Sequence, residues 1–262
     1  MQTVPHAPRA VIGVLSLAWA TLGCAPAPLV RADWDPSGPA HHPPASADPE
    51  PTEPGPHAAQ MHSWFDGVTA ARDAMIAGDG PAVTVAAEQL SAALPAGPGT
   101  VPKTWRPSID QLRADAVELQ HATELGAAAS AIARMANTCG QCHASLGVVP
   151  AVEAALVTDD AVPRGATAHD VMRGHAFGAE RMWEGMVLPS TDRWVRGTTM
   201  FVITPDCPQD GATAGSDSRC DRTRALARRA HLVDDPRGRV ALYGEILVTC
   251  AGCHTRTPGA VR

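Results

Sequence analysis

The sequence is poor in aromatic residues, in net positive charge and in long hydrophobic runs. Its 262 residues include one Tyr and three Phe, and the formal net charge is −6. Nucleic-acid-binding domains carry a basic surface, so this charge argues against a nucleic-acid partner. The apolar run at residues 11–22 is too short to span a membrane. What remains is an Ala-rich chain, a composition that suits helices.

One five-residue motif occurs twice. Residues 139–143 read Cys-Gly-Gln-Cys-His and residues 250–254 read Cys-Ala-Gly-Cys-His. C-x-x-C-H is the attachment signature of c-type haem. Positions i, i+3 and i+4 share one face of a helix, so two thiols can bond the vinyl groups of one haem while the imidazole ligates its iron. We therefore predict two covalently attached haem c groups, held by Cys139, Cys142, His143, Cys250, Cys253 and His254.

Two other chemistries use paired cysteines. A single C-x-x-C-H could be half of a zinc site or a redox-active dithiol. Those sites need a second Cys pair in the same fold or a thioredoxin-like β-α-β context, and neither is visible in the sequence. Two copies with His in the same place favour covalent haem.

Both copies belong to a repeat that extends along the chain. Cys250 minus Cys139 is 111, and the same offset relates other residue pairs. These pairs are Met61 and Met172, Gly67 and Gly178, Met75 and Met186, and Thr138 and Thr249. A fixed offset over this length indicates an internal repeat. The chain therefore uses one module of about a hundred residues twice, an ordinary domain size.

The apolar periodicity and the Gly and Pro breaks predict four helices in each module. The predicted helices cover residues 58–77, 82–94, 107–121 and 123–143, and then 169–187, 192–203, 222–231 and 237–254. Four helices with the attachment motif at the end of the last one suggest a compact antiparallel bundle. The predicted fold class is all-α, with two tandem four-helix bundles. Such a core would be completed by the bound macrocycle.

The N-terminal part of the chain predicts export. Residues 1–10 carry Arg9 and no acid, and the apolar run follows them, as in a signal peptide. Leu22-Gly23-Cys24 resembles a bacterial lipoprotein processing site, in which the Cys is lipidated; the alternative is cleavage after Ala20. The Pro-rich stretch that follows reads as a semi-extended tether. We expect a periplasmic protein or a lipoprotein anchored to a membrane through Cys24.

These patterns divide the chain into five parts. They are a signal peptide at 1–23, a disordered tether at 24–56, the first haem-binding bundle at 57–147, a linker at 148–168 and the second haem-binding bundle at 169–262. Two cysteines, Cys207 and Cys220, have no role in haem attachment. Outside the cytosol we expect them to form a disulfide, which would stabilise the fold by roughly 3 kcal/mol, the alternative being two free thiols.

A helical module that ends in C-x-x-C-H resembles the cytochrome c-prime family of four-helix-bundle c-type cytochromes. The resemblance covers both modules, through residues 139–143 and 250–254. It implies a haem inside each bundle, with its distal face against the first helix. Some members of that family lack a sixth ligand and bind small gases, whereas others use a first-helix Met and carry electrons. The tandem arrangement and the tether depart from single-bundle members.

The sixth iron ligand has three candidate solutions. Met61 and Met172 lie in the first helices at the haem offset, and a thioether ligand raises the reduction potential. Taken singly, each could be a core methionine. His175 lies one turn from Met172, but its counterpart is Trp64, and the counterpart of His62 is Arg173. We expect Met61 and Met172 to ligate, with His62 and His175, or no ligand at all, as the alternatives.

These expectations favour an electron-transfer protein over an enzyme. Covalent haem, export and a tether fit a di-haem cytochrome that exchanges electrons with redox partner proteins of unknown identity near a membrane. The alternative is a protein that binds NO or CO at open distal sites. A di-haem peroxidase also carries two C-x-x-C-H motifs, but its chain is generally longer and its modules differ from this helical repeat.

Overall fold

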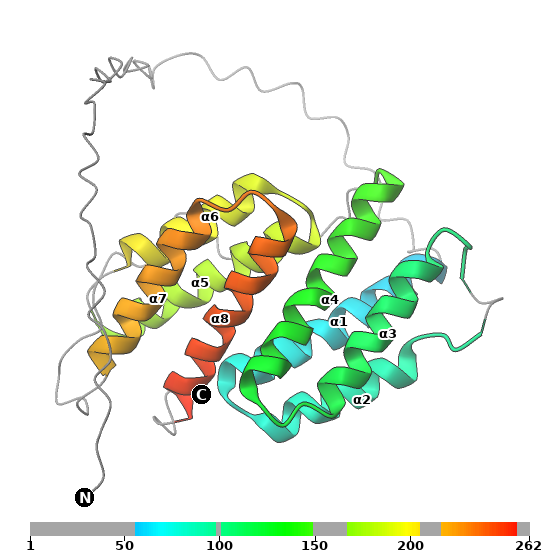
Figure 1. Cartoon of the computed structure of the whole chain (residues 1–262), viewed down its shortest axis with the longest axis horizontal. Helices are drawn as coiled ribbons and strands as arrows, with labels where there is room; N and C mark the ends of the chain where they lie inside the picture. Colours follow the sequence, from blue (N-terminus) through cyan, green and yellow to red (C-terminus); the bar gives the residue numbers. More distant parts are fainter. Residues whose placement is uncertain (1–55, 98–100, 149–166, 205–215, 256–262) are drawn as a thin grey trace, which may run out of the picture. The chain divides into compact units, whose positions relative to one another are not determined.

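The chain is all-helical wherever its structure is described. The computed structural model describes residues 56–97, 101–148, 167–204 and 216–255, and these form eight α-helices and no strand (Figure 1). The helices are α1 (Pro56–Ala77), α2 (Gly80–Ala93), α3 (Arg106–Gln120), α4 (Leu125–Leu146), α5 (Ala168–Val187), α6 (Thr191–Ile203), α7 (Ser216–His231) and α8 (Pro236–His254). The predicted all-α class is confirmed. Each predicted helix is present, with α7 starting six residues earlier than expected.

Local sequence signals explain where the helices begin and end. Asp79 accepts a hydrogen bond from the Ala82 amide at the start of α2, and Asp235 caps α8 by accepting from the Gly238 amide. A proline follows each cap in the first turn, where its missing N–H costs nothing. Helix α1 ends at Gly78, whose φ of 73° reverses the chain in the left-handed conformation that glycine tolerates. The Gly and Pro residues at the junction of α1 and α2 thus separate the two helices, as predicted.

Packing between helices follows chain order within each repeat, but it also crosses between the repeats. Successive helices contact one another from α1 to α4 and again from α5 to α8. Helix α4 also lies along α8, α1 packs against α8, and α4 packs against α5 (Figure 1). By contrast, α5 makes few contacts with α8 of its own repeat. The first and last helices of each repeat therefore pack against helices of the other repeat.

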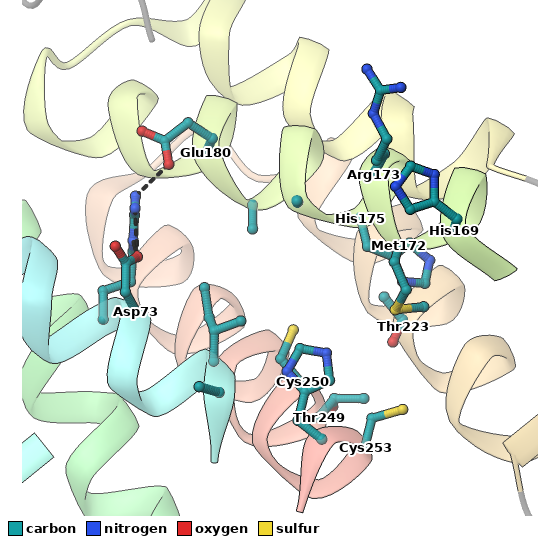
Figure 2. Close-up of a pocket in the computed structure, with 16 residues that line it drawn as sticks. Asp73, His169, Met172, Arg173, His175, Glu180, Thr223, Thr249, Cys250 and Cys253 are labelled. Carbon is teal, nitrogen blue, oxygen red and sulfur yellow. Dashed lines mark hydrogen bonds and ion pairs between the residues drawn. The ribbon is translucent and has the colours of Figure 1, made fainter. Parts of the chain in front are cut away.

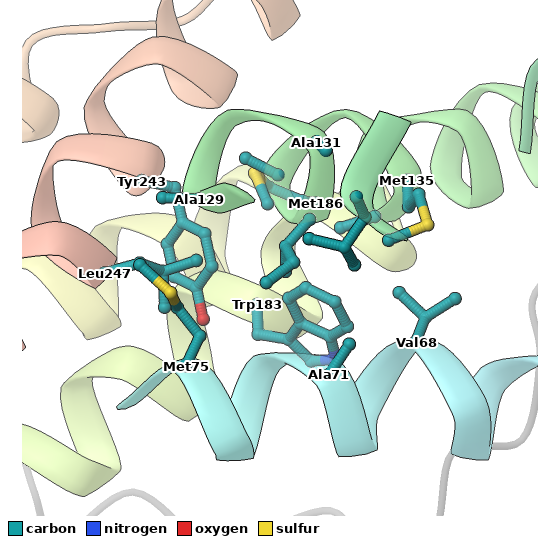
Figure 3. Close-up of a cluster of buried hydrophobic side chains, with 14 of the residues drawn as sticks. Val68, Ala71, Met75, Ala129, Ala131, Met135, Trp183, Met186, Tyr243 and Leu247 are labelled. Carbon is teal, nitrogen blue, oxygen red and sulfur yellow. The ribbon is translucent and has the colours of Figure 1, made fainter. Parts of the chain in front are cut away.

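The result is one hydrophobic core shared by both repeats. Its central side chains come from all four of these helices (Figure 3): Val68, Ala71, Met75, Ala129, Ala131, Met135, Trp183, Met186, Tyr243 and Leu247. Residues 53–262 accordingly form one compact unit. The duplication seen in the sequence is not matched by two separate cores.

Arg72 and Trp183 meet near the middle of this core. They occupy equivalent positions, since 183 minus 72 is 111. The Arg72 guanidinium lies 4.9 Å from the centre of the Trp183 ring, and its Nη1 lies 2.7 Å from Oε2 of Glu180. Tyr243, fully buried on α8, donates its hydroxyl to the Ala179 carbonyl of α5 at 3.2 Å. The cation–π contact and the ion pair of Arg72 therefore join the repeats, in addition to apolar packing, whereas the Tyr243 hydrogen bond lies within the second repeat.

Several predictions lie outside the described residues. These include the signal peptide, the tether and the lipidation of Cys24. Cys207 also lies outside them, and the side chain of Cys220 is not described although its backbone is in the first turns of α7. The disulfide therefore stays a prediction. Within the described ranges, no helix combines the length and the hydrophobicity that a membrane crossing needs.

Candidate cofactor sites

Both C-x-x-C-H motifs lie in the last turns of a helix, α4 in the first repeat and α8 in the second. Each motif borders a cavity of about 440 Å³, a size typical of small-molecule and cofactor pockets. The helical conformation brings the two cysteines and the histidine to one side of the helix, as the spacing predicts. The predicted attachment residues of each motif therefore share a cavity.

The first cavity brings together residues from four helices. Met61 lines it from α1, Leu112 from α3, Cys139, Cys142 and His143 from α4, and Val187 from α5. The predicted axial methionine and the predicted attachment motif thus line the same pocket. Met61 is only partly buried and packs against the core.

The second cavity repeats this plan. Met172 and His175 line it from α5, while Cys250, Cys253 and His254 line it from α8 (Figure 2). Figure 2 shows that the two α5 side chains and the two cysteines come from facing helices. Thr223 of α7 completes this side of the pocket. Equivalent residues of the two repeats therefore form two equivalent cavities.

His143 is held in the tautomer that a metal ligand needs. Its Nδ1 lies 2.9 Å from the backbone carbonyl oxygen of Val187, which can only accept, so Nδ1–H is the donor. A neutral imidazole with its proton on Nδ1 keeps a lone pair on Nε2. Metal-ligating histidines usually donate their second nitrogen to a carbonyl or carboxylate in this way, which orients the ring and raises its basicity.

His254 differs from His143 at this atom. Its Nδ1 is buried, and it has no hydrogen-bond partner within the described part of the chain. A buried nitrogen without a partner is uncommon and costs free energy. The two proximal histidine candidates are therefore chemically inequivalent, although the motifs that contain them look alike in the sequence.

The four motif cysteines are free thiols. Burial raises the pKa of the Cys139 thiol to about 12, with a smaller contribution from Cys142. Burial also raises the pKa of the Cys250 thiol to about 12, with a smaller contribution from Cys253. Redox-active C-x-x-C pairs depend on a lowered thiol pKa, because the thiolate is the nucleophile. The raised pKa values argue against the dithiol alternative. Among the described residues, no group of three or more His, Cys, Asp or Glu side chains is arranged to hold a metal ion.

The candidates for a second axial ligand differ between the cavities. In the second, burial lowers the pKa of His175 to about 4, helped by Arg224 and His254, so this imidazole is neutral at neutral pH. Its counterpart Trp64 lines the first cavity and donates its ring N–H to the Ala93 carbonyl at 3.1 Å. Methionine is therefore available in both cavities. Apart from the motif histidines, a partly buried histidine lines only the second, since His62, which lines the first cavity, is exposed.

Sequence reasoning missed the residues that each cavity receives from the other repeat. Val187 of α5 lines the first cavity, while Arg72, Asp73, Ile76 and Ala77 of α1 line the second. No motif marks these positions. The one available signal was the apolar pair Ile76 and Val187 at equivalent places near the ends of α1 and α5, where a solvated helix end would favour polar residues.

Comparison of the chain with protein-family models, with curated proteins and with solved structures found no match.

Proposed function

We propose that this protein is an exported di-haem c-type cytochrome that transfers electrons. One observation carries the proposal: in each repeat, a C-x-x-C-H motif and a first-helix methionine, far apart in the sequence, line the same cavity of about 440 Å³. The resemblance to the cytochrome c-prime family points to the same arrangement, with haem between the first and last helices. The proposed role is transfer of electrons rather than turnover of a substrate.

The residues at each cavity fit a covalently bound haem. Cys139 and Cys142 would form the two thioethers of the first site, and His143 would be its proximal ligand. The hydrogen bond from His143 to the Val187 carbonyl supports this role, since it orients the ring and places a proton on Nδ1, so that Nε2 is the nitrogen left to ligate a metal. Haem c supplies a one-electron iron couple when it is bound. Cys250, Cys253 and His254 would hold the second haem.

Met61 and Met172 are the proposed sixth ligands. Each lines the cavity that contains its own repeat's motif. A thioether favours the ferrous state and raises the reduction potential relative to a histidine ligand. His175, which lines the second cavity as a neutral imidazole, is the competing ligand there.

The spacing of the cavities supports a relay between the two sites. Asp66 of α1 borders the first cavity and Arg72 of the same helix borders the second. These residues are six positions apart, which is about 9 Å along a helix. Glu180 and Val187 of α5 border the second and first cavities and are about 10 Å apart on the same reckoning. Because electron tunnelling weakens exponentially with distance, short separations favour exchange between sites.

The location of this function belongs to the same proposal. A lipid anchor at Cys24 and the Pro-rich tether at 24–56 would keep the helical unit near a membrane surface while letting it reach soluble or membrane-bound redox partners. The negative formal charge, which haem propionates would increase, favours partners with a basic docking surface.

Mass spectrometry and absorption spectroscopy of protein matured in a haem-competent periplasm test the proposal. We expect the mass of the processed polypeptide plus two haems, and low-spin spectra in both redox states. Met61→Ala and Met172→Ala should each convert one haem to a high-spin form. High-spin wild-type spectra with rapid CO binding would instead support the gas-binding alternative, and a polypeptide without haem would refute both.

A further inference from the structure

The two candidate sites are contacted differently by the helix ends that reach them from the other repeat. The end of α5 packs on the motif of α4, and the end of α1 packs on the motif of α8. Val187 and Ile76, which are equivalent in the repeat, line the first and second cavity respectively. The contact is therefore similar in plan, but within the described ranges His143 makes a hydrogen bond there and His254 does not.

Gly140 explains this difference. A Cβ added at Gly140 would lie 1.9 Å from the carbonyl oxygen of Met186 and 3.4 Å from Cδ of Pro189. Only glycine therefore lets the end of α5 approach α4 so closely. The equivalent position in the second motif is Ala251, which is fully buried. A methyl group therefore stands at the position where the first motif has none.

The close approach has an electrostatic consequence. Val187 is the last residue of α5, so no later turn of that helix supplies a donor for its carbonyl oxygen. The carbonyl also lies at the negative end of the helix dipole. A hydrogen bond to such an acceptor increases the electron-donating strength of the imidazole and so stabilises ferric iron more than ferrous iron. His254 lacks this partner.

We propose that Gly140 is a positioning residue that makes the two haem sites inequivalent, by letting the end of α5 hydrogen-bond His143. This inference rests on the proposed function. The first haem has the lower reduction potential, and the electron of a half-reduced molecule resides mainly at the second. Electron transfer between the two haems would thereby have a preferred direction, set by Gly140 in one motif and Ala251 at the equivalent position of the other.

Gly140→Ala in the holoprotein tests this directly, with the two midpoint potentials measured by spectroelectrochemistry. The added methyl must push α5 away and so break the hydrogen bond of His143. The lower of the two potentials should then rise by at least 59 mV, which for one electron is a tenfold change in the reduction equilibrium. The higher potential should stay unchanged. Gly126→Ala on the same helix is the control: its Cβ would meet no atom within 4 Å, and both potentials should match the wild type.

Ala251→Gly is the reciprocal variant and adds no bulk. It should let the end of α1 approach α8 and lower the potential of the second haem. Proton NMR supplies an independent readout, because the hydrogen-bonded Nδ1 proton of His143 should be lost in Gly140→Ala and one from His254 should appear in Ala251→Gly. Two bound haems with unchanged potentials in Gly140→Ala would overturn the inference. If that variant does not fold, an unchanged second potential in Ala251→Gly overturns it, whereas absence of haem from the wild type would overturn the proposed function itself.

Discussion

Replacing Trp183 by alanine tests whether the two repeats form one cooperative unit. Trp183 is fully buried on α5, and its ring lies 4.9 Å from the Arg72 guanidinium of α1. The Tyr243 ring of α8 is 6.0 Å from it (Figure 3). Truncating a buried Trp to Ala costs about 3–5 kcal/mol through lost transfer free energy and the remaining cavity. Arg72 would also lose the aromatic face that covers its charge.

The expected result is a single unfolding transition that moves as a whole. For a domain of about 150–250 residues, each kcal/mol lowers Tm by roughly 2–4 °C, so Trp183→Ala should lower it by roughly 6–20 °C. Scanning calorimetry, with far-UV circular dichroism as a second probe, measures the shift. Ile203→Ala is the control: Ile203 is 62% exposed on α6, and its loss should change stability by no more than about 0.5 kcal/mol.

The opposite result is equally clear. If the wild type unfolds in two separate transitions and Trp183→Ala moves only one of them, the repeats are independent bundles in contact, and the shared core does not couple their folding. The same outcome would weaken the inference on Gly140, because that inference needs the end of α5 to be held firmly against α4.

Three further variants test local features. Gly78→Ala should lower the free energy of unfolding by at least about 1–2 kcal/mol in a urea titration, because φ is 73° and the new Cβ would lie 2.6 Å from Cγ2 of Thr255. Asp115→Ala should cost about 1.5–3 kcal/mol by the same assay, since the 2% exposed carboxylate accepts from Nε of Arg134 at 2.7 Å; an unchanged urea midpoint would mean that this ion pair is not formed. Met172→Ala should change the spectrum of one haem only, and an unchanged low-spin spectrum would assign the sixth position to His175.

Much of the local structure could be predicted because it depends on short-range chemistry. Asp79 with the following Gly-Pro marks the end of one helix and the start of the next, and the structure has both within two residues of the expected positions. The prediction placed the start of α7 too late. Its first turns, residues 216–221, are polar and show no apolar period from which a helix could be recognised. The placement of the motif residues on one side of a helix also followed from the period of 3.6 residues per helical turn.

The candidate sites were predictable only within one repeat. The motif and the first-helix methionine could be paired because the offset of 111 residues applies to both. Val187 and Ile76 could not be assigned to cavities, because they belong to the opposite repeat and nothing in their local sequence states which helix they will contact. Nothing in the sequence around Gly140 indicates which helix will pack against it.

The amino-acid sequence by itself determined the duplicated unit, the eight helical segments and the two sets of Cys and His side chains. Only the tertiary structure decided that the first and last helices of the repeats pack across to each other and share a core. The physical reason is that α4 buries small alanines, among them Ala128, Ala129, Ala131, Ala133 and Ala136, around more than one side. Such a helix has no single apolar face from which its partners can be read, so long-range packing chooses them, and with them the hydrogen bond of His143.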